Sequence, residues 1–405
     1  MKKLIIPAAV CVLFASCVSM EKTYTGTIPV YETIKPEKKA GHKKEDAPKE
    51  KTAVFPSARE AADIMRVLLY EQKKIILESR GKIRAKGGGE IPSSGCFEIT
   101  AENGRINVNG GFIDAKNILF SSRDPIKINS GKNYRGDIAV YLKDGLIKTI
   151  NIVSMSEYLY GVLPSEISPK WPYEALRAQA VAARTFAVHR RVHNKTPEYD
   201  LDATAFSQVY KGFDIEHERT NKAVDDTKNE VLIHNGRVIQ AFFHANSGGR
   251  TAAPEEVWGG RLEYMKSVDD EFSLGEKYGS WEHREKLYTI AVRLTNRGIN
   301  TGELYNISPV DLTESGRIKT VKLYGGNGTF FLKGTLFRSY VGVNLLRSTK
   351  FTMEIEKDEV IFKGAGWGHG VGMSQEGAKI MAEKGFDYKK ILNHYYPAAR
   401  LAVVR

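Results

Sequence analysis

One long helical pattern limits what this chain can fold into more than any other feature of its sequence. Residues 172–194 read PYEALRAQAVAARTFAVHRRVHN, with Pro172 in the first turn, where proline is tolerated. One face of the predicted helix carries small or apolar side chains at helical spacing: Leu176, Ala180, Ala183 and Ala187. Because alanine side chains let neighbouring segments approach closely, the sequence predicts a central, buried helix.

Residues on both sides of this helix alternate between apolar and polar side chains, which indicates β-strands. The first group extends over residues 74–152 and includes IAVYLKDGLIKTINIV, in which Asp144-Gly145 is typical of a two-residue hairpin turn. A second hairpin turn is predicted at Asn235-Gly236, within VLIHNGRVIQAFF. These segments therefore predict antiparallel strands.

The remaining segments predict helices and a further group of strands. A capping box followed by apolar residues at helical spacing predicts a helix over residues 57–70. More strands are expected over residues 288–361, and two helices, from about Ser374 and about Tyr388, close the chain. Segregated strands and helices predict an α+β fold, with mixed β-rich subdomains around the Ala-rich central helix and a cleft.

The amino terminus has the layout of an export signal. Two lysines, a mostly apolar stretch and two small residues precede Cys17, so we expect a signal peptide over residues 1–16. A Cys in this place resembles the lipid-attachment site of bacterial lipoproteins, but Phe14 departs from that pattern and leaves cleavage without lipid open. The Lys-, Glu-, Pro- and Thr-rich residues 17–57 predict a disordered tether. We expect an exported, membrane-anchored lipoprotein that faces the periplasm or the cell wall.

Charge and cysteine content restrict the partners and the bonds that this chain can form. The 405 residues carry a formal net charge of +12, which favours nucleic acid, anionic lipid or an acidic cell-wall polymer. Nucleic acid is disfavoured by the export signal and by the lack of a basic stripe interleaved with aromatic residues. Cys11 lies in the signal and Cys17 would carry lipid, so Cys96 has no partner for an internal disulfide.

One carboxylate just before the central helix is a candidate acid. Glu166 lies in YLYGVLPSEISPKWP, in a loop predicted between Pro164 and Pro169. The amino terminus of the helix favours the ionised carboxylate, whereas the apolar neighbours Leu163 and Trp171 favour the protonated acid. A glycosidase acid must keep its proton near neutral pH, so the apolar influence has to prevail in such a role. The alternative is an exposed loop or capping residue.

Four blocks of sequence, in a fixed order, carry a family resemblance. They are YLYGVLPSEISPKWPYEALRAQAVAARTFAV, DATAFSQVYKG at 202–212, FFHANSGGRT at 242–251 and GWGHGVGMSQEGA at 366–378. Together with the ending YKKILNHYYPAARL, they resemble the stage II sporulation protein D family (the SpoIID/LytB domain). The resemblance implies a SpoIID/LytB-like catalytic domain over residues 131–405, preceded by a helix and β-rich strands at 58–130.

The resemblance also implies an activity. Catalytic members of the family are lytic transglycosylases of peptidoglycan, which cut the β-1,4 bond between N-acetylmuramic acid and N-acetylglucosamine, and it places their acid at Glu166. The acid protonates the leaving oxygen, and the carboxylate then takes the proton of the sugar's own 6-hydroxyl, giving a 1,6-anhydro end. Because water is not the nucleophile, the second carboxylate of ordinary glycosidases is dispensable. The alternative is a non-catalytic, glycan-binding enhancer of a cell-wall amidase, as some relatives are thought to be.

The other blocks are expected to line the cleft and bind peptidoglycan glycan strands. Roles of this kind are expected for Arg184, Gln208, Ser247, Trp367, His369 and Gln375. The two neutral side chains Gln208 and Ser247 suit acetamido and hydroxyl groups, and Trp367 suits stacking on a sugar ring. Arg184 is expected to hold a lactyl carboxylate or to orient Glu166, unless it is a structural ion-pair residue.

The proposed chemistry requires neither a metal nor a cofactor. GWGHGVG is superficially similar to a dinucleotide-binding loop, but its glycines do not follow the G-x-G-x-x-G form. His189 and His193 are four residues apart on the central helix and could share a metal, although cations at a helix carboxyl end need none. A pairing of His244 with His369 or His283 is also open, and the spacing does not demand it.

Overall fold

The computed structural model describes residues 63–88, 90–194, 196, 198–204, 207–275 and 277–404. The expected signal peptide (1–16), the lipid-attachment site Cys17 and the expected tether (17–57) lie outside these residues. In the part of the chain that is described, no helix is both long enough and apolar enough to cross a membrane.

The N-terminal region consists of strands whose apolar side chains form one large core. They are β1 (Ile64–Gln72), β2 (Lys74–Lys86), β3 (Ser94–Glu102), β4 (Arg105–Val108), β5 (Gly111–Ile113), β6 (Asn117–Ser121), β7 (Ile126–Ile128), β8 (Asn133–Tyr134), β9 (Asp137–Lys143) and β10 (Leu146–Ser154). With β11 (Leu201–Asp202) they form a sheet in the order β11-β1-β10-β9-β6-β2-β3-β4-β5. Strand β7 pairs with β2 and with β8.

The helix predicted over residues 57–70 is wrong where the structure describes it, because β1 begins at Ile64. Met65 and Val67 are fully buried and alternate with less buried neighbours, as in a strand. Ile64 pairs with Ser154 of β10 in an antiparallel register. A short apolar run of this kind fits both the helical period of about 3.6 residues and the strand period of 2, and pairing with β10 decides for the strand.

Both predicted hairpin turns are confirmed. Asp144 and Gly145 join β9 to β10 with φ angles of 51° and 74°. Asn235 and Gly236 join β12 (Glu230–His234) to β13 (Arg237–Val238) with φ angles of 48° and 76°. Positive φ at both central residues matches the twist of the flanking strands, which explains the Asp-Gly and Asn-Gly pairs.

The helices at the centre of the molecule bear out two more predictions. They are α1 (Met155–Glu166), α2 (Tyr173–His193), α3 (Glu218–Asp226), α7 (Gln375–Glu383) and α8 (Tyr388–Tyr395). The Ala-rich run forms α2, which is buried from Ala175 to Val188 except at Arg177. It packs against α1, α3, α7 and α8, so the predicted central helix is confirmed. The two closing helices are confirmed as α7 and α8.

A second β-rich region has its own apolar core. Its elements are β15 (Trp281–Lys286), α5 (Leu287–Thr295), β16 (Leu304–Leu312), β17 (Ile318–Gly325), β18 (Gly328–Lys333), α6 (Gly334–Val341), β19 (Phe351–Glu356) and β20 (Glu359–Gly364). We call residues 281–364 the inserted lobe. The strands predicted here are interrupted by α5 and α6, a correction that the sequence concealed because α5 is rich in β-branched residues. Its buried side chains recur at helical spacing: Leu287, Ile290, Ala291 and Leu294.

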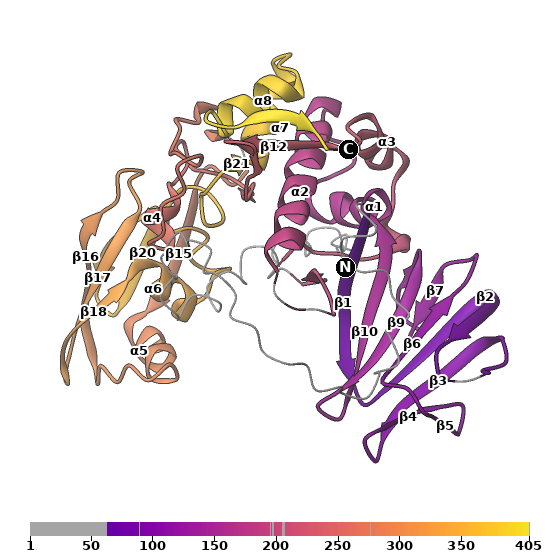
Figure 1. Ribbon diagram of the computed structural model, residues 1–405. Helices are drawn as coiled ribbons and strands as arrows, with labels where there is room; N and C mark the ends of the chain where they lie inside the picture. Colours follow the sequence, from indigo (N-terminus) through magenta and orange to yellow (C-terminus); the bar gives the residue numbers. More distant parts are fainter. Residues whose placement is uncertain are drawn as a thin grey trace, which may run out of the picture.

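The remaining elements are short, and the last of them, β22, pairs with β12. They are the helix α4 (Pro254–Val257), the 3₁₀ turns η3 (Phe213–Ile215) and η4 (Glu271–Ser273), and the strands β14 (Phe243–His244), β21 (Met373–Ser374) and β22 (Arg400–Val403). The chain leaves the centre after β14 and returns at β21, which pairs with β14 in parallel. The N-terminal strands and the inserted lobe lie on opposite sides of the central helices (Figure 1). The predicted α+β class is confirmed.

Candidate active site

The position of Glu166 is set by the carboxyl end of α1. The helix begins with a capping box, in which the Ser154 hydroxyl oxygen accepts the Glu157 N–H at 3.2 Å and the Glu157 carboxylate accepts the Ser154 N–H at 3.4 Å. Glu166 is the last helical residue, and Pro164 is accommodated inside the helix. The predicted loop position is therefore wrong, and Glu166 faces the negative end of a helix dipole instead of the positive one.

A segment of the second block, residues 208–212, packs along α1 at Gly161. A Cβ atom at Gly161 would lie 2.6 Å from the ring of Tyr210, so this close approach requires glycine. The approach brings the Val209 N–H to Glu166, whose Oε1 accepts its hydrogen bond at 3.3 Å. Two blocks that are far apart in sequence thus meet at the candidate acid.

The electrostatic setting of Glu166 favours its protonated form. The residue is 2% exposed, and burial raises the pKa of its carboxyl from 4.5 to about 7. The Val209 N–H and the Lys211 ammonium favour the carboxylate, but together they oppose only part of the effect of burial. A carboxyl group with a pKa near 7 can both give and take a proton at neutral pH.

Gln208 lies beside this acid, but its amide is already bonded to protein groups. The Tyr158 hydroxyl donates to Gln208 Oε1 at 3.0 Å, and Gln208 Nε2 donates to the Ala183 carbonyl of α2 at 3.2 Å. The side chain is 1% exposed. In this structure Gln208 fixes the 208–212 segment between α1 and α2.

The hydrogen bonds of Arg184 go to α3 and to the start of β12. Its guanidinium donates to the Val224 carbonyl at 2.9 Å, and to the Glu230 carbonyl and the Thr227 hydroxyl at 3.3 Å each. Burial lowers the pKa of the Arg184 guanidinium to about 10. Its hydrogen bonds join α2 to α3 and to the start of β12, which fits the structural alternative, and a role toward Glu166 or a lactyl carboxylate stays a prediction.

The third block contributes to a second buried polar group, which we call the Asp270 cluster (Ser247, Asp270, Ser273 and Tyr395). Asp270 is fully buried, and it accepts hydrogen bonds from the Ser247 hydroxyl at 2.7 Å and from the Tyr395 hydroxyl at 2.8 Å. The hydroxyls of Ser247 and Ser273 are 2.7 Å apart. Ser247, expected to bind sugar, is fully buried here and already hydrogen-bonded.

Two other predicted binding residues are also buried. Trp367 is 4% exposed, and its ring lies 4.5 Å from both the Tyr278 ring and the Arg347 guanidinium. Gln375 donates from Nε2 to Gln179 Oε1 of α2 at 3.4 Å. In this conformation Trp367 presents little ring surface on which a sugar could stack.

His369 and His244 form a pair of neutral imidazoles. His369 Nδ1 accepts the Val371 N–H at 3.0 Å, whereas His244 Nδ1 donates to the Val371 carbonyl at 3.1 Å. Their ring centroids are 5.6 Å apart. Burial lowers the pKa of His369 to about 3 and that of His244 well below its ordinary value. His283 stacks on Phe362 in the inserted lobe, apart from this pair.

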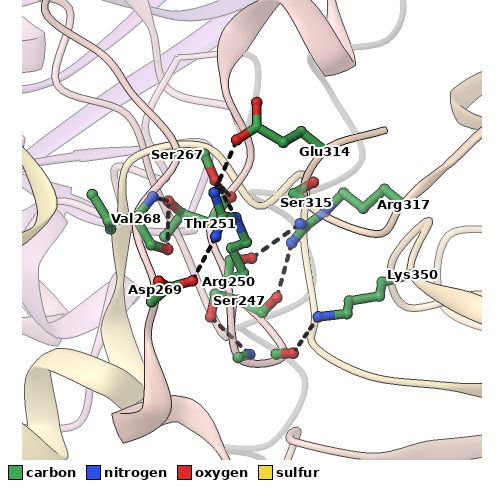
Figure 2. Close-up of polar contacts among 12 residues, drawn as sticks. Ser247, Arg250, Thr251, Ser267, Val268, Asp269, Glu314, Ser315, Arg317 and Lys350 are labelled. Atoms are coloured by element: carbon green, nitrogen blue, oxygen red, sulfur yellow. Dashed lines mark hydrogen bonds and ion pairs between the residues drawn. The ribbon is translucent and has the colours of Figure 1, made fainter. Parts of the chain in front are cut away.

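The loop that contains Ser247 is held by two cations of the inserted lobe, as Figure 2 shows. Arg317 donates to the carbonyls of Ser247 at 2.9 Å and Arg250 at 3.0 Å. Lys350 donates to the Gly248 carbonyl at 2.8 Å. Three carbonyls of one loop thus depend on side chains that follow it by 67 to 102 positions in the sequence.

Sequence reasoning missed Arg317, although its neighbour carried a signal. Gly370 has a φ angle of 85°, and a Cβ atom there would lie 2.2 Å from the Arg317 guanidinium. The glycine-rich block therefore makes room for a bulky buried group and is not only a series of tight turns. Gly370 indicates that another group packs closely against its backbone, but the sequence of the fourth block does not show that this group is Arg317.

No metal-ligand group emerges from the side chains that the structure describes: no three or more of their His, Cys, Asp and Glu residues gather to hold an ion. His189 and His193 stack with ring centroids 4.0 Å apart, and His193 Nδ1 lies 2.8 Å from the His189 carbonyl oxygen. Cys96 is exposed and free.

Helix α2 contacts both the second and the fourth block. The Gln375 amide, from the fourth block, contacts Gln179, while the Gln208 amide from the second block contacts the Ala183 carbonyl. These two α2 positions are one helical turn apart, about 6 Å along the axis. The blocks that resemble one family therefore assemble around one helix.

Two family models match parts of the chain. Residues 143–234 match the family model of the stage II sporulation protein (SpoIID), and residues 254–372 match a domain of unknown function (DUF8618). The first match contains Glu166, Arg184 and Gln208. The second includes the inserted lobe, Asp270 and Arg317.

Three curated relatives extend the comparison. The chain is 33% identical over 293 residues to an uncharacterized protein of Brachyspira hyodysenteriae, across 72% of this chain and 78% of that protein. It is 29% identical to the amidase enhancer of Bacillus subtilis, across 77% of this chain but only half of that protein. It is also 29% identical to stage II sporulation protein D of Bacillus subtilis, across 63% of this chain and 76% of that protein. The chain belongs to the stage II sporulation protein D (SpoIID) family.

Proposed function

We propose that the protein is a peptidoglycan lytic transglycosylase in which Glu166 acts first as acid and then as base. The observation that carries the proposal is a fully buried carboxyl group whose pKa is raised to about 7. Strongly shifted carboxyl pKa values are concentrated at functional sites, where a reaction uses the proton. Sequence resemblance and local electrostatics support the same residue independently.

The proposed reaction needs one proton to move twice. Protonated Glu166 gives its proton to the glycosidic oxygen as the bond from the N-acetylmuramic acid carbon to that oxygen breaks. The carboxylate then takes the proton of the 6-hydroxyl of the same sugar, whose oxygen bonds to that carbon and closes the 1,6-anhydro ring. The Val209 N–H, 3.3 Å from Oε1, would steady the carboxylate between the two steps.

Mass spectrometry of the products tests this proposal. Purified protein is incubated with glycan strands, with and without stem peptides, and the ends of the fragments are identified. We expect 1,6-anhydro-N-acetylmuramic acid ends from the unmodified protein and none from Glu166→Gln. Glu157→Gln, on the same helix but at its capping box, is the matched control and should retain cleavage.

The relative named amidase enhancer favours a second candidate function, a glycan-binding module that stimulates a cell-wall amidase. This role needs the shape of the site but not the proton of Glu166. Stimulation of an amidase that is equal for the unmodified protein and Glu166→Gln, with no anhydro ends from either, would replace the first proposal by the second.

We propose further that the protein is exported and held at a membrane through lipid on Cys17, with the tether 17–57 letting the folded part reach the wall. Acyl chains give stable attachment only when more than one signal is present, so a multiply acylated cysteine fits this role. Metabolic labelling with a radioactive fatty acid tests it: label should enter the unmodified protein and not Cys17→Ala.

A further inference from the structure

The inserted lobe exposes aromatic side chains that its own core does not use. Tyr288 is 77% exposed, Phe331 63%, Tyr324 52% and Tyr305 49%. The core of the lobe is made by other residues, among them Leu287, Val321 and Phe362. Large apolar groups that gather on a surface mark a place where something binds.

Helix α5 shows the pattern most clearly. One face buries Leu287, Ile290 and Leu294 in the core of the lobe. Tyr288 and Val292, one turn apart, lie on the other face, and Val292 is 40% exposed. A helix of two turns with apolar side chains on both faces is expected to contact something besides its own core.

The outer face of α5, the start of β16 and the turn between β19 and β20 line an open cavity of about 760 Å³. This volume is within the range of about 300–1,000 Å³ found for sites that hold small ligands. The lining of the cavity is mostly apolar and includes Val292 and Leu304, and aromatic rings and polar groups lie among these aliphatic side chains: Tyr288, Asn296, Glu303, Tyr305, Lys357 and Asp358.

The aromatic surface continues from this cavity over the neighbouring sheet. The rings of Tyr305 and Tyr324 have centroids 5.9 Å apart. Tyr324 pairs with Thr329 across β17 and β18, so Phe331 is its diagonal neighbour on the same exposed face, at about 7–8 Å. We call Tyr288, Tyr305, Tyr324 and Phe331 the aromatic strip.

This combination fits a sugar ring better than a protein surface. A pyranose ring has an apolar C–H face that stacks on an aromatic ring and a rim of hydroxyl and acetamido groups that bond to carboxylates and amides. A stable protein partner would instead need about 800 Å² of surface with few charges at its centre. Two carboxylates, Glu303 and Asp358, and one ammonium group, Lys357, are among the lining groups, so their charges do not favour an anion.

We propose that the cavity and the aromatic strip bind N-acetylhexosamine rings of a glycan strand. The proposal rests on the proposed function for the identity of the polymer, but it concerns a separate place, because β16 lies at the outer edge of the inserted lobe and α5 at its lower end, both apart from α1 (Figure 1). The lobe would hold one stretch of the strand while the Glu166 site acts on another.

Calorimetric titration with a soluble N-acetylglucosamine tetrasaccharide tests the proposal. The full chain is used with Glu166→Gln as the background, so that binding is measured without cleavage. Because each stacked ring contributes modestly, Tyr288→Ala and Tyr305→Ala should each weaken binding by roughly 5- to 10-fold. Leu312→Ala is the matched control: Leu312 is 59% exposed at the other end of β16, outside the cavity, and its removal should leave binding unchanged.

The exposure of Tyr288 and Tyr305 makes loss of folding a poor explanation for weaker binding, and the melting temperature of each variant checks this point. Failure of the background chain to bind the tetrasaccharide would overturn the inference. Binding by both tyrosine variants that is as tight as that of the background chain would overturn it too. Capture of a protein partner that depends on Tyr288, without sugar binding, would also overturn it. Cleavage by the unmodified chain is assayed separately, so loss of the transglycosylase proposal would not be mistaken for loss of this one.

Discussion

Two buried carboxyl groups, Asp270 and Glu166, differ in the hydrogen bonds that they accept. Asp270 is fully buried and accepts hydrogen bonds of 2.7 and 2.8 Å from two hydroxyls. Glu166 is equally buried, yet its one hydrogen bond among the described residues is a 3.3 Å contact from the Val209 N–H. Two short hydrogen bonds offset the burial of the Asp270 carboxyl group, whereas Glu166 has one long hydrogen bond and burial raises its pKa. The difference fits a structural role for Asp270 and supports the acid role that we propose for Glu166.

The largest expected effect separates the two residues by activity. Glu166→Gln should lower the rate of anhydro-end formation by at least about 100-fold, because it removes a general acid. Asp270→Asn, compared at a temperature where both variants are folded, should retain most of the activity. Mass spectrometry measures the rate of anhydro-end formation by each variant. If Asp270→Asn were as inactive as Glu166→Gln, the two residues would not differ in the way proposed.

The next effect separates them by stability. Asp270→Ala removes the acceptor of two buried hydroxyls, and we expect a loss of about 3–5 kcal/mol in the free energy of unfolding. Gly377 lies over the same carboxylate, since a Cβ atom there would be 2.6 Å from Asp270 Oδ1. Denaturant unfolding followed by circular dichroism measures the change. An unchanged midpoint would show that Asp270 is not structural.

Glu166 should contribute to the pH dependence of stability, with a sign opposite to that of the buried His244 and His369, whose pKa values burial lowers. Its pKa is about 7 in the folded chain against an ordinary 4.5, a difference of 2.5 (7 − 4.5), which corresponds to roughly 3 kcal/mol. Because the folded pKa is the higher one, this contribution is complete below pH 4.5 and is lost as the pH rises through 7. The unfolding free energy is measured at pH 5 and at pH 8. Its decrease between these two pH values should therefore be smaller in Glu166→Gln than in the unmodified protein. Parallel pH curves would contradict the raised pKa.

The smallest effect sharpens the role of Ser247. Its hydroxyl donates to Asp270, so Ser247→Ala should cost about 1–2 kcal/mol of unfolding free energy. Because the hydroxyl is fully buried, the KM for glycan strands should not change. A raised KM with unchanged stability would mean that the Asp270 cluster opens to substrate, as the sequence pattern first suggested.

The sequence predicted those parts of the fold that are decided locally. The buried helix α2 follows from its own spacing of Leu and Ala, and the two hairpin turns follow from Asp144-Gly145 and Asn235-Gly236. The strand β1 was mistaken for a helix because its state depends on pairing with β10, some eighty residues later in the chain. Local patterns do not contain such a partner.

The candidate site divides in the same way. Resemblance identified Glu166, but its place at the end of α1 depends on a proline tolerated inside the helix. The roles of Arg184 and Ser247 depend on partners in other segments, and sequence spacing does not reveal these. Arg317 lies in none of the four blocks, and its role depends on the carbonyls to which it donates.

The parallel pairing of β14 with β21 also sets the order in which the molecule can assemble. Phe243 contacts Met373, so the pairing closes a loop of 130 residues (373 − 243). Closing a flexible loop of that length costs conformational entropy and slows folding. The intervening inserted lobe has its own core, so it can fold first and bring the ends of the loop together. We therefore expect refolding in two kinetic phases, with the lobe in the faster one.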